Sequence, residues 1–263
     1  MEQESLRIAM LQYSIVWEDK QANLDKVASW LEEKRPEADL LVLPEMFTTG
    51  FSMKAEELSE PDEGETIDRV KHWARYFDMA IAGSFIARKD NCFYNRAFFV
   101  TPDGNSFFYN KRHLFSIGSE HTVFSAGKEK VIVPYKGWNI CMQICYDLRF
   151  PVWTRNAANG YDLLIYMANW PASRISSWNI LLPARAVENQ AYVCGVSRVG
   201  EDGLQVKHNG YSSIYDMKGK LLAEFEPEEE GIKVTTLSLN ALNEFRKKFP
   251  VWKDADRFEI DLE

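Results

Sequence analysis

The sequence predicts a single α/β domain built around a mixed sheet. Helix-like and strand-like patterns alternate along all 263 residues, as they do in layered α/β proteins. No linker, repeat or low-complexity stretch separates them, so residues 1–263 are expected to form one domain. Consecutive strand patterns are more frequent in the second half, which favours a mixed sheet over a purely parallel one.

Strands and helices are expected in turn through the first half of the chain. Apolar runs predict strands at 6–14, 38–43 and 79–87. Pro44 should end the second of these strands, because proline has no N–H to donate to a sheet ladder. Apolar residues three and four apart predict helices at 23–34 and 65–77. The remaining element is a hairpin over 96–111, with Pro-Asp-Gly-Asn as its turn.

The second half is expected to be richer in strands. Two strands should flank a turn near Lys136-Gly137, and a short helix should begin at Pro151. A helical pattern covers 176–190, but Pro183 should kink or divide it. Further strands are expected at 161–170, 191–199, 211–216, 220–225 and 232–239. A last helix at 240–249 precedes an extended tail, and the acidic run 224–231 is expected to be a solvated loop.

Composition and charge argue against several classes of function. The net charge of −8 disfavours nucleic-acid binding, which needs clustered lysine and arginine. The first ten residues carry acids where a secretory signal carries bases, and no apolar run is long enough to span a bilayer. We therefore expect a cytoplasmic protein whose four cysteines are thiols. Its cysteines and histidines show no metal-ligand spacing, so no metal and no cofactor are expected.

Three reactive side chains come directly after predicted strands. Glu45 follows the run LLVLP, Lys111 follows the second strand of the hairpin, and Cys145 ends the run NICMQIC. Ligands of open α/β sheets gather beyond strand ends, so these three side chains are expected to share a cleft. Cys141 lies on the same strand with no adjacent loop, and is expected to be structural.

A thiol, a carboxylate and an ammonium are the groups that amide hydrolysis uses. Glu45 is expected to take the proton of Cys145 and make its sulfur nucleophilic. Lys111 and the backbone N–H after Cys145 are expected to stabilise the oxyanion. Taken singly, each residue is more often a packing or solvated residue. Their joint appearance within longer motifs predicts an active site.

The sequence resembles the nitrilase, or carbon–nitrogen hydrolase, superfamily over nearly its whole length. The resemblance rests on the segments LVLPEMF, YNKRHLF, EHTVFSAG, ICYDLRFP and ANWP. It implies a catalytic triad of Glu45, Lys111 and Cys145, with Glu120 as a second catalytic glutamate that orients the lysine and assists the substrate. It also implies a four-layer αββα sandwich that forms a homodimer or higher homo-oligomer, with residues 249–263 as a tail at the dimer interface.

Within that superfamily the segments CYDLRFPVW, ANWPASR and ARAVENQAYV look most like the bacterial omega-amidases. This implies hydrolysis of the terminal amide of small 2-oxo acids, such as 2-oxoglutaramate and 2-oxosuccinamate. Tyr146-Asp147 stands where nitrile-hydrolysing relatives tend to have Trp-Glu, which favours an amide. Val152 departs from the glutamate of many relatives, which concerns a helix contact and not the chemistry.

A small anionic substrate needs a local cationic anchor, because the chain as a whole is acidic. Arg149 and Arg174 are the candidates, since guanidinium binds carboxylate bidentately. An ion pair between Arg149 and Asp147 is an equally good interpretation. Tyr146, Trp170 and Phe115 are candidates for the pocket wall, although the two last could equally be core residues.

Other interpretations stay open from the sequence. One is a different carbon–nitrogen hydrolase specificity, for a carbamoyl amine, a ureido acid, a glutamine-like amide or a nitrile. Another is a noncatalytic redox-sensing protein, which the accompanying acids and lysine disfavour because a sensor needs only the thiol. A protease-like pair of Cys145 with His113 lacks a matching signature. The acidic segment 48–65 is a candidate lid.

Overall fold

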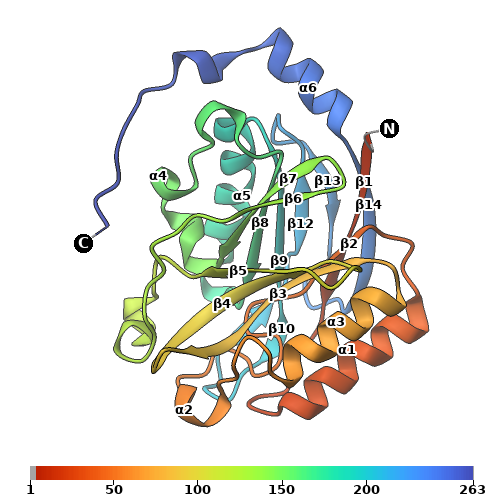
Figure 1. The fold of residues 1–263 in the computed structure, drawn as a ribbon, viewed down its shortest axis with the longest axis vertical. Helices are drawn as coiled ribbons and strands as arrows, with labels where there is room; N and C mark the ends of the chain where they lie inside the picture. The colour runs from red at the N-terminus through yellow and green to blue at the C-terminus, as the bar shows by residue number, and fades with distance from the viewer. Residues whose placement is uncertain (1–3, 263) are drawn as a thin grey trace.

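The chain folds into two six-stranded sheets packed face to face, as the computed structural model of residues 4–262 shows (Figure 1). Across the first sheet the strands are β14 (Gly231–Ser238), β1 (Ser5–Gln12), β2 (Leu40–Val42), β3 (Ala80–Lys89), β4 (Cys92–Val100) and β5 (Ser106–Asn110). Across the second they are β13 (Leu221–Glu224), β12 (Ser213–Tyr215), β9 (Tyr192–Ser197), β8 (Leu163–Ala168), β7 (Trp138–Ile144) and β6 (Ile132–Tyr135). The central strands of each sheet are parallel and the outer ones antiparallel, so both sheets are mixed, as predicted.

Helices cover the outer face of each sheet. On the first sheet, α1 (Lys20–Lys34) and α3 (Glu65–Tyr76) lie side by side (Figure 1). On the second, α5 (Ile175–Asn189) packs Trp178, Leu182 and Ala186 against the sheet. The order helix, sheet, sheet, helix confirms the four-layer αββα sandwich.

The alternation of side chains along each strand builds these layers. In β1, Leu6, Ile8 and Met10 point into the core between the sheets, whereas Ala9 and Leu11 pack with α1 and α3. This follows from the two-residue period of a strand, in which successive side chains point to opposite faces. Because both faces of the central strands are buried, their sequences read as continuous apolar runs.

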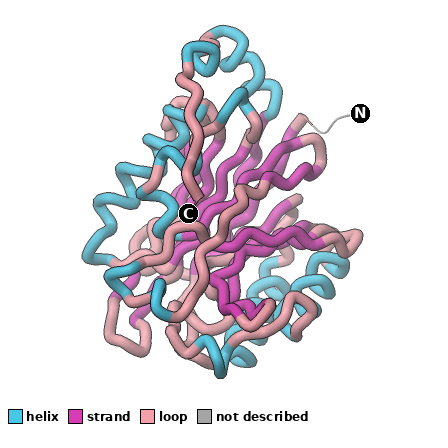
Figure 2. The backbone as a smooth tube through the Cα atoms, turned by 60° about the vertical axis from the view of Figure 1, so that its left-hand side comes forward, coloured by secondary structure: helices cyan, strands magenta, loops and turns pink. Residues whose placement is uncertain are grey.

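Shorter elements complete the chain. A ribbon of β10 (Val199–Glu201) and β11 (Lys207–Asn209) stands beside the two sheets, and α2 (Ala55–Leu58) and α4 (Pro151–Thr154) are single turns. After α6 (Leu239–Lys248), residues 255–262 run along the molecule without helix or strand (Figures 1 and 2). Within residues 4–262, every helix is too short or too polar to cross a bilayer.

Some local expectations were wrong. Of the two outcomes expected at Pro183, a kink or a division of the helix, the division is wrong: α5 continues past Pro183, because the packing of Trp178 and Leu182 on the sheet outweighs the hydrogen bond that proline removes. The expected strand at 191–199 is broken after Ser197, where the chain leaves the sheet for the ribbon. The tail is not extended from its start, since Val251–Asp254 forms a 3₁₀ turn. The hairpin, the short helix at Pro151 and the acidic loop before β14 are confirmed.

The contact between β9 and α5 gives a test of how tightly the second sheet is packed. A Cβ atom on Gly195 would lie 2.6 Å from Cδ1 of Leu182 and 2.7 Å from Cζ2 of Trp178. We predict that Gly195→Ala lowers the free energy of unfolding by about 1–3 kcal/mol, as overpacked cores do. Urea denaturation measures this free energy. The control is Ser176→Ala, which changes an exposed residue of α5, the helix that carries Trp178 and Leu182. Equal stability of both variants would contradict the packing described.

Candidate active site

The three reactive residues meet where strands of both sheets end. Glu45 lies three residues beyond β2, Lys111 directly follows β5, and Cys145 directly follows β7. The first two belong to one sheet and the third to the other, so face-to-face packing brings them together. All three line one cavity of about 310 Å³.

Lys111 is held between two carboxylates in the protein interior. Its Nζ donates to Oε1 of Glu45 at 2.9 Å and to both carboxylate oxygens of Glu120, at 3.0 and 2.9 Å. The three side chains are at most 1 % exposed. Glu120 Oε2 also accepts the backbone N–H of Phe115 at 2.5 Å. One ammonium therefore balances two buried carboxylates, and fixes the position of both.

Two asparagines complete the binding of Glu45, and the sequence analysis missed both. Asn95 donates from Nδ2 to Glu45 at 2.7 Å and to Glu120 at 3.0 Å. Asn169 donates its backbone N–H to Glu45 Oε2 at 2.8 Å and its Nδ2 to the backbone carbonyl of Glu45 at 2.6 Å. Asn95 interrupts an apolar strand and Asn169 follows the strand β8 in the quoted segment ANWP. Each is a polar residue at a position where the sequence pattern predicts an apolar one, and this departure can be seen in the sequence.

Cys145 occupies a strained backbone position. Its φ is 42°, in the left-handed region that a non-glycine residue rarely adopts. The strand β7 turns here into the 3₁₀ turn Cys145–Arg149. Such strain persists only where the surroundings enforce it, and it is frequent at functional sites.

Asp147 enforces that turn, and is a further residue that the sequence analysis did not select. Its Oδ2 accepts the backbone N–H of Ile144 at 3.0 Å and the hydroxyl of Tyr109 at 2.8 Å. Its Oδ1 accepts the backbone N–H of His113 at 2.9 Å and lies 2.8 Å from His113 Nδ1. The completely buried carboxylate thus ties the turn of Cys145 to the loop that carries Lys111.

The charges of the cluster determine its protonation. Burial raises the pKa of Cys145 well above its ordinary value and Glu45 raises it further, against the opposing effect of Lys111. Burial also raises the pKa of Glu120, which Lys111 counteracts. Burial alone would lower the pKa of Lys111, but Glu120 and Glu45 together raise it. The sulfur is therefore a thiol and the lysine is charged.

The predicted wall residues lie around the same cavity. It is lined by all five, Tyr146, Arg149, Trp170, Phe115 and Arg174. The guanidinium of Arg149 lies 5.2 Å from the ring centre of Trp170, and that of Arg174 lies 5.1 Å from the ring centre of Phe115.

The ion pair considered between Arg149 and Asp147 does not form. Arg149 instead donates from Nη2 to Ser177 Oγ at 2.8 Å. The carboxylate of Asp147 accepts hydrogen bonds from Tyr109 and from the backbone N–H of His113. The carboxylate points back into the core, because it caps its own turn. Nearness in sequence was misleading here.

His113 does not lie where a catalytic base would, and the segment 48–65 is not a free loop. His113 stacks on Phe150, with 3.8 Å between ring centres, and does not line the cavity. In the segment 48–65, Phe51 and Met53 contribute to the cavity wall. Farther along, Glu60 exchanges backbone hydrogen bonds with Ile86 and Arg88 of β3, so this part is attached to the sheet.

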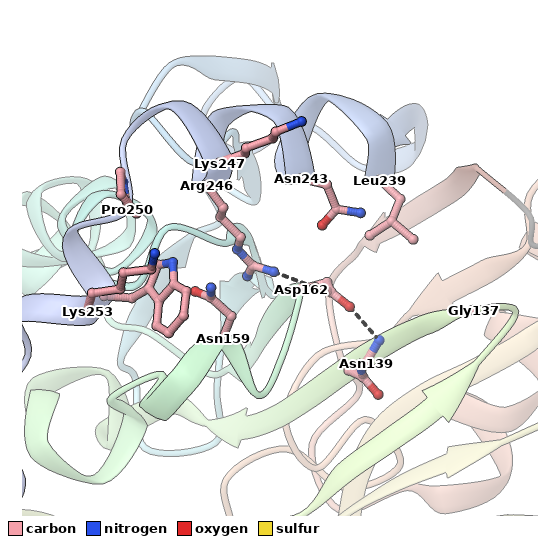
Figure 3. Close-up of a pocket in the computed structure, with 11 residues that line it drawn as sticks. Gly137, Asn139, Asn159, Asp162, Leu239, Asn243, Arg246, Lys247, Pro250 and Lys253 are labelled. Carbon is pink, nitrogen blue, oxygen red and sulfur yellow. Dashed lines mark hydrogen bonds and ion pairs between the residues drawn. The ribbon is translucent and has the colours of Figure 1, made fainter.

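A larger groove of about 580 Å³ lies beside α6 (Figure 3). Arg246 donates there to Asp162, and to the backbone carbonyls of Gln190 and Tyr161. Asp162 also accepts the backbone N–H of Asn139 at 2.9 Å. These groups satisfy one another, and the groove is lined by neither cysteine nor glutamate. Between residues 4 and 262, no group of three or more potential ligands is arranged to hold a metal ion.

A comparison with protein families identifies the chain. The model of the carbon-nitrogen hydrolase family matches residues 7–247, which include every residue of the cluster and both sheets except the first two residues of β1. The chain belongs to the carbon–nitrogen hydrolase family. It is therefore a hydrolase that acts on carbon–nitrogen bonds.

Individual relatives of this carbon–nitrogen hydrolase are similar over nearly the whole chain. Omega-amidase YafV of Yersinia enterocolitica is 46% identical over 254 residues, covering 97% of this chain and 98% of that protein. The 2-oxoglutaramate amidase of Bacillus subtilis is 35% identical, covering 94% and 96%. A solved CN-hydrolase superfamily protein of Xanthomonas campestris, with an arsenic adduct in its active site, superposes with a TM-score of 0.95. It is 40% identical, with 98% of this chain and 100% of that chain covered.

The raised pKa of Cys145 gives a direct test of the cluster's electrostatics. The ordinary pKa of a cysteine thiol is about 9, and burial and Glu45 raise that of Cys145 well above this value. We therefore predict that Cys145 forms no thiolate below pH 9. The thiolate is measured by the ultraviolet difference between wild type and Cys145→Ala during a pH titration. Glu45→Gln should lower the pKa, since it removes a negative charge.

The control for that titration is Cys141→Ala, which changes a buried thiol of the same strand outside the cavity. It should leave the signal of Cys145 in place. A thiolate already formed at neutral pH in the wild type would contradict the electrostatics described.

Proposed function

We propose that this hydrolase removes the terminal amide of small 2-oxo acids, such as 2-oxoglutaramate and 2-oxosuccinamate, and releases the dicarboxylate and ammonia. The observation that carries the proposal is the convergence of Cys145, Glu45 and Lys111 in a cavity that also holds two arginines. The names of the relatives, omega-amidase and 2-oxoglutaramate amidase, support the substrate class.

The first half of the reaction forms a thioester. Glu45 takes the thiol proton while the sulfur of Cys145 bonds to the amide carbon. Negative charge develops on the amide oxygen, where Lys111 Nζ and the backbone N–H of Tyr146 stabilise it. Glu45 then gives the proton to the nitrogen, the carbon–nitrogen bond breaks, and ammonia leaves.

The second half restores the enzyme. Glu45 takes a proton from water, the hydroxide oxygen bonds to the thioester carbon, and the same two donors stabilise the oxyanion. The carbon–sulfur bond breaks, the carboxylic acid product departs, and the proton returns to Cys145. Glu120 and Asn95 act as positioning residues, because Glu120 accepts a hydrogen bond from Lys111 and Asn95 donates to both Glu45 and Glu120.

The arginines support an anionic substrate. Neither Arg149 nor Arg174 forms an ion pair with a carboxylate within residues 4–262, although both line the cavity. A guanidinium without an acidic partner is ready to bind the carboxylate of a ligand. Trp170 and Phe115 orient the two groups by stacking beneath them.

We also propose a cytoplasmic homodimer or higher homo-oligomer, in which residues 1–263 form one domain and the tail 249–263 lies at the interface. Exposed apolar side chains on adjacent helices support an interface, among them Val152 of α4 and Ile180 and Val187 of α5. The four cysteines are unpaired, and a nucleophilic thiol suits a reducing compartment.

Ammonia release from a panel of compounds tests the function. We predict that wild type hydrolyses 2-oxosuccinamate and 2-oxoglutaramate faster than carbamoyl amines, ureido acids or nitriles. Cys145→Ala should have no turnover and Glu45→Gln almost none, because each removes a group that forms or breaks a bond. Lys111→Met should lose roughly 100- to 1000-fold in kcat, the usual cost of a lost oxyanion donor.

The control is again Cys141→Ala, which should keep the wild-type rate, with folding checked by circular dichroism. Turnover by Cys145→Ala would contradict the mechanism, and a clear preference for another compound class would contradict the substrate. Absence of hydrolysis with every compound would favour the redox-sensing alternative.

A further inference from the structure

A serine outside the catalytic cluster connects the two arginines of the cavity wall. Ser177 lies in the first turn of α5, and its Oγ accepts a hydrogen bond from Nη2 of Arg149 at 2.8 Å. The hydroxyl of Ser177 donates in turn to the backbone carbonyl of Arg174 at 2.7 Å. Because a hydroxyl has only one hydrogen, Ser177 is a donor toward Arg174 and an acceptor toward Arg149.

Arg149 has no other hydrogen-bond partner than this serine within residues 4–262. Its guanidinium carries five N–H groups, and one of them is used. Nε and Nη1 have no partner among these residues, and neither atom is buried. Since Arg149 lines the cavity, its remaining N–H groups are available to a ligand there.

The hydrogen bond to Ser177 leaves the guanidinium of Arg149 able to bind a carboxylate through two N–H groups. A guanidinium has two such edges, because Nη2 shares one edge with Nε and the other with Nη1. Nη2 has an N–H on each edge, so its single bond to Ser177 occupies one edge and leaves the other complete. Bidentate binding of a carboxylate uses one complete edge.

The face of the Arg149 guanidinium is held by Trp170. The guanidinium carbon lies 5.2 Å from the ring centre of Trp170. Trp170 is buried, and its Nε1 donates to the backbone carbonyl of Arg174 at 2.9 Å. Stacking alone would let the guanidinium turn in its own plane above the ring. The bond to Ser177 at its edge prevents this rotation.

Arg174 has no comparable restraint on its guanidinium. That group lies 5.1 Å from the ring centre of Phe115, and no residue within 4–262 accepts a hydrogen bond from it. The acids that line the cavity, Glu45 and Asp202, form no ion pair with either arginine in this part of the chain. Arg149 is therefore the better oriented of the two cationic groups.

We infer that Ser177 is a positioning residue, which holds Arg149 in the orientation in which it binds the substrate's carboxylate. This inference rests on the proposed function. The carboxylate lies at the end of the substrate opposite the amide, and Arg149 ends the 3₁₀ turn that begins at Cys145. An anchor that is already oriented loses less conformational freedom when the substrate binds.

A purely structural role for Ser177 makes a different prediction. A serine hydroxyl that donates to the carbonyl three residues earlier is a common local hydrogen bond, and in that role it only satisfies the backbone. Its loss would then affect the start of α5, whatever residue stands at position 149. The hydrogen bond from Arg149 predicts an effect on substrate binding that depends on Arg149.

The test measures KM and kcat for 2-oxosuccinamate in wild type, Ser177→Ala and Ser177→Thr. Ser177→Ala should raise KM about tenfold and keep kcat within about twofold, because a lost hydrogen bond to the anchor weakens the binding of substrate and transition state alike. Ser177→Thr keeps the hydroxyl and should restore most of the wild-type KM. The control is Ser176→Ala, which changes the exposed neighbour and should keep both constants.

A double-mutant cycle decides whether the effect passes through Arg149. Arg149→Met keeps an unbranched side chain without the charge, and in this background Ser177→Ala should change kcat/KM less than about twofold. In the background of Arg174→Met, which keeps the backbone carbonyl that Ser177 binds, the effect of about tenfold should remain. Rates at low substrate concentration give kcat/KM even where KM is too high to measure.

An unchanged KM in Ser177→Ala, or an equal effect with and without Arg149, would overturn the inference while the proposed function stands. Loss of the effect only in the background of Arg174→Met would assign the anchor to Arg174 and overturn the inference as well. If wild type hydrolyses no 2-oxo acid amide, the proposed function fails and the inference with it. Should Ser177→Ala not fold, Ser177→Val replaces it, since valine has the shape of threonine and lacks the hydroxyl.

Discussion

A single buried ammonium group holds the active site together. Lys111 lies between Glu45 and Glu120, and none of these side chains is more than 1 % exposed. Without the lysine, two carboxylates would face each other in the interior, where like charges repel strongly because little solvent screens them. The same ammonium lines the cavity where the proposed oxyanion would form. In the proposed mechanism, the interaction that stabilises this part of the fold is therefore also the one that the chemistry uses.

The sandwich explains why this arrangement can be rigid. Glu45 and Lys111 come from one sheet and Cys145 from the other, so the core between the sheets fixes their separation. Asp147 connects the two sides, because it caps the turn of Cys145 and binds the backbone of the loop after Lys111. The left-handed backbone of Cys145 is maintained by these contacts, and presents the sulfur to the cavity.

Much of this was predictable from the sequence, and the exceptions have a physical pattern. Glu45, Lys111 and Cys145 could be found because each follows an apolar run, and strand ends are visible in sequence. Asn95 and Asp147 were missed, because their importance depends on burial and on partners 25 to 50 positions away. The choice for Arg149 between a substrate contact and an ion pair with Asp147 stayed open in the sequence, because local spacing does not reveal which way a side chain points. The division of α5 expected at Pro183 was wrong because tertiary packing overrode a local preference.

The central claim concerns the charge balance around Lys111, and a double-mutant cycle tests it most directly. The free energies of unfolding of Lys111→Met, Glu120→Gln and the double variant are compared with wild type. Lys111→Met should cost about 3–5 kcal/mol, since it leaves buried charge uncompensated. The free energy of unfolding that the double variant loses should be smaller than the sum of the two single losses by about 1–3 kcal/mol, because one of the two facing carboxylate charges is gone. Effects that add within about 0.5 kcal/mol would contradict the account.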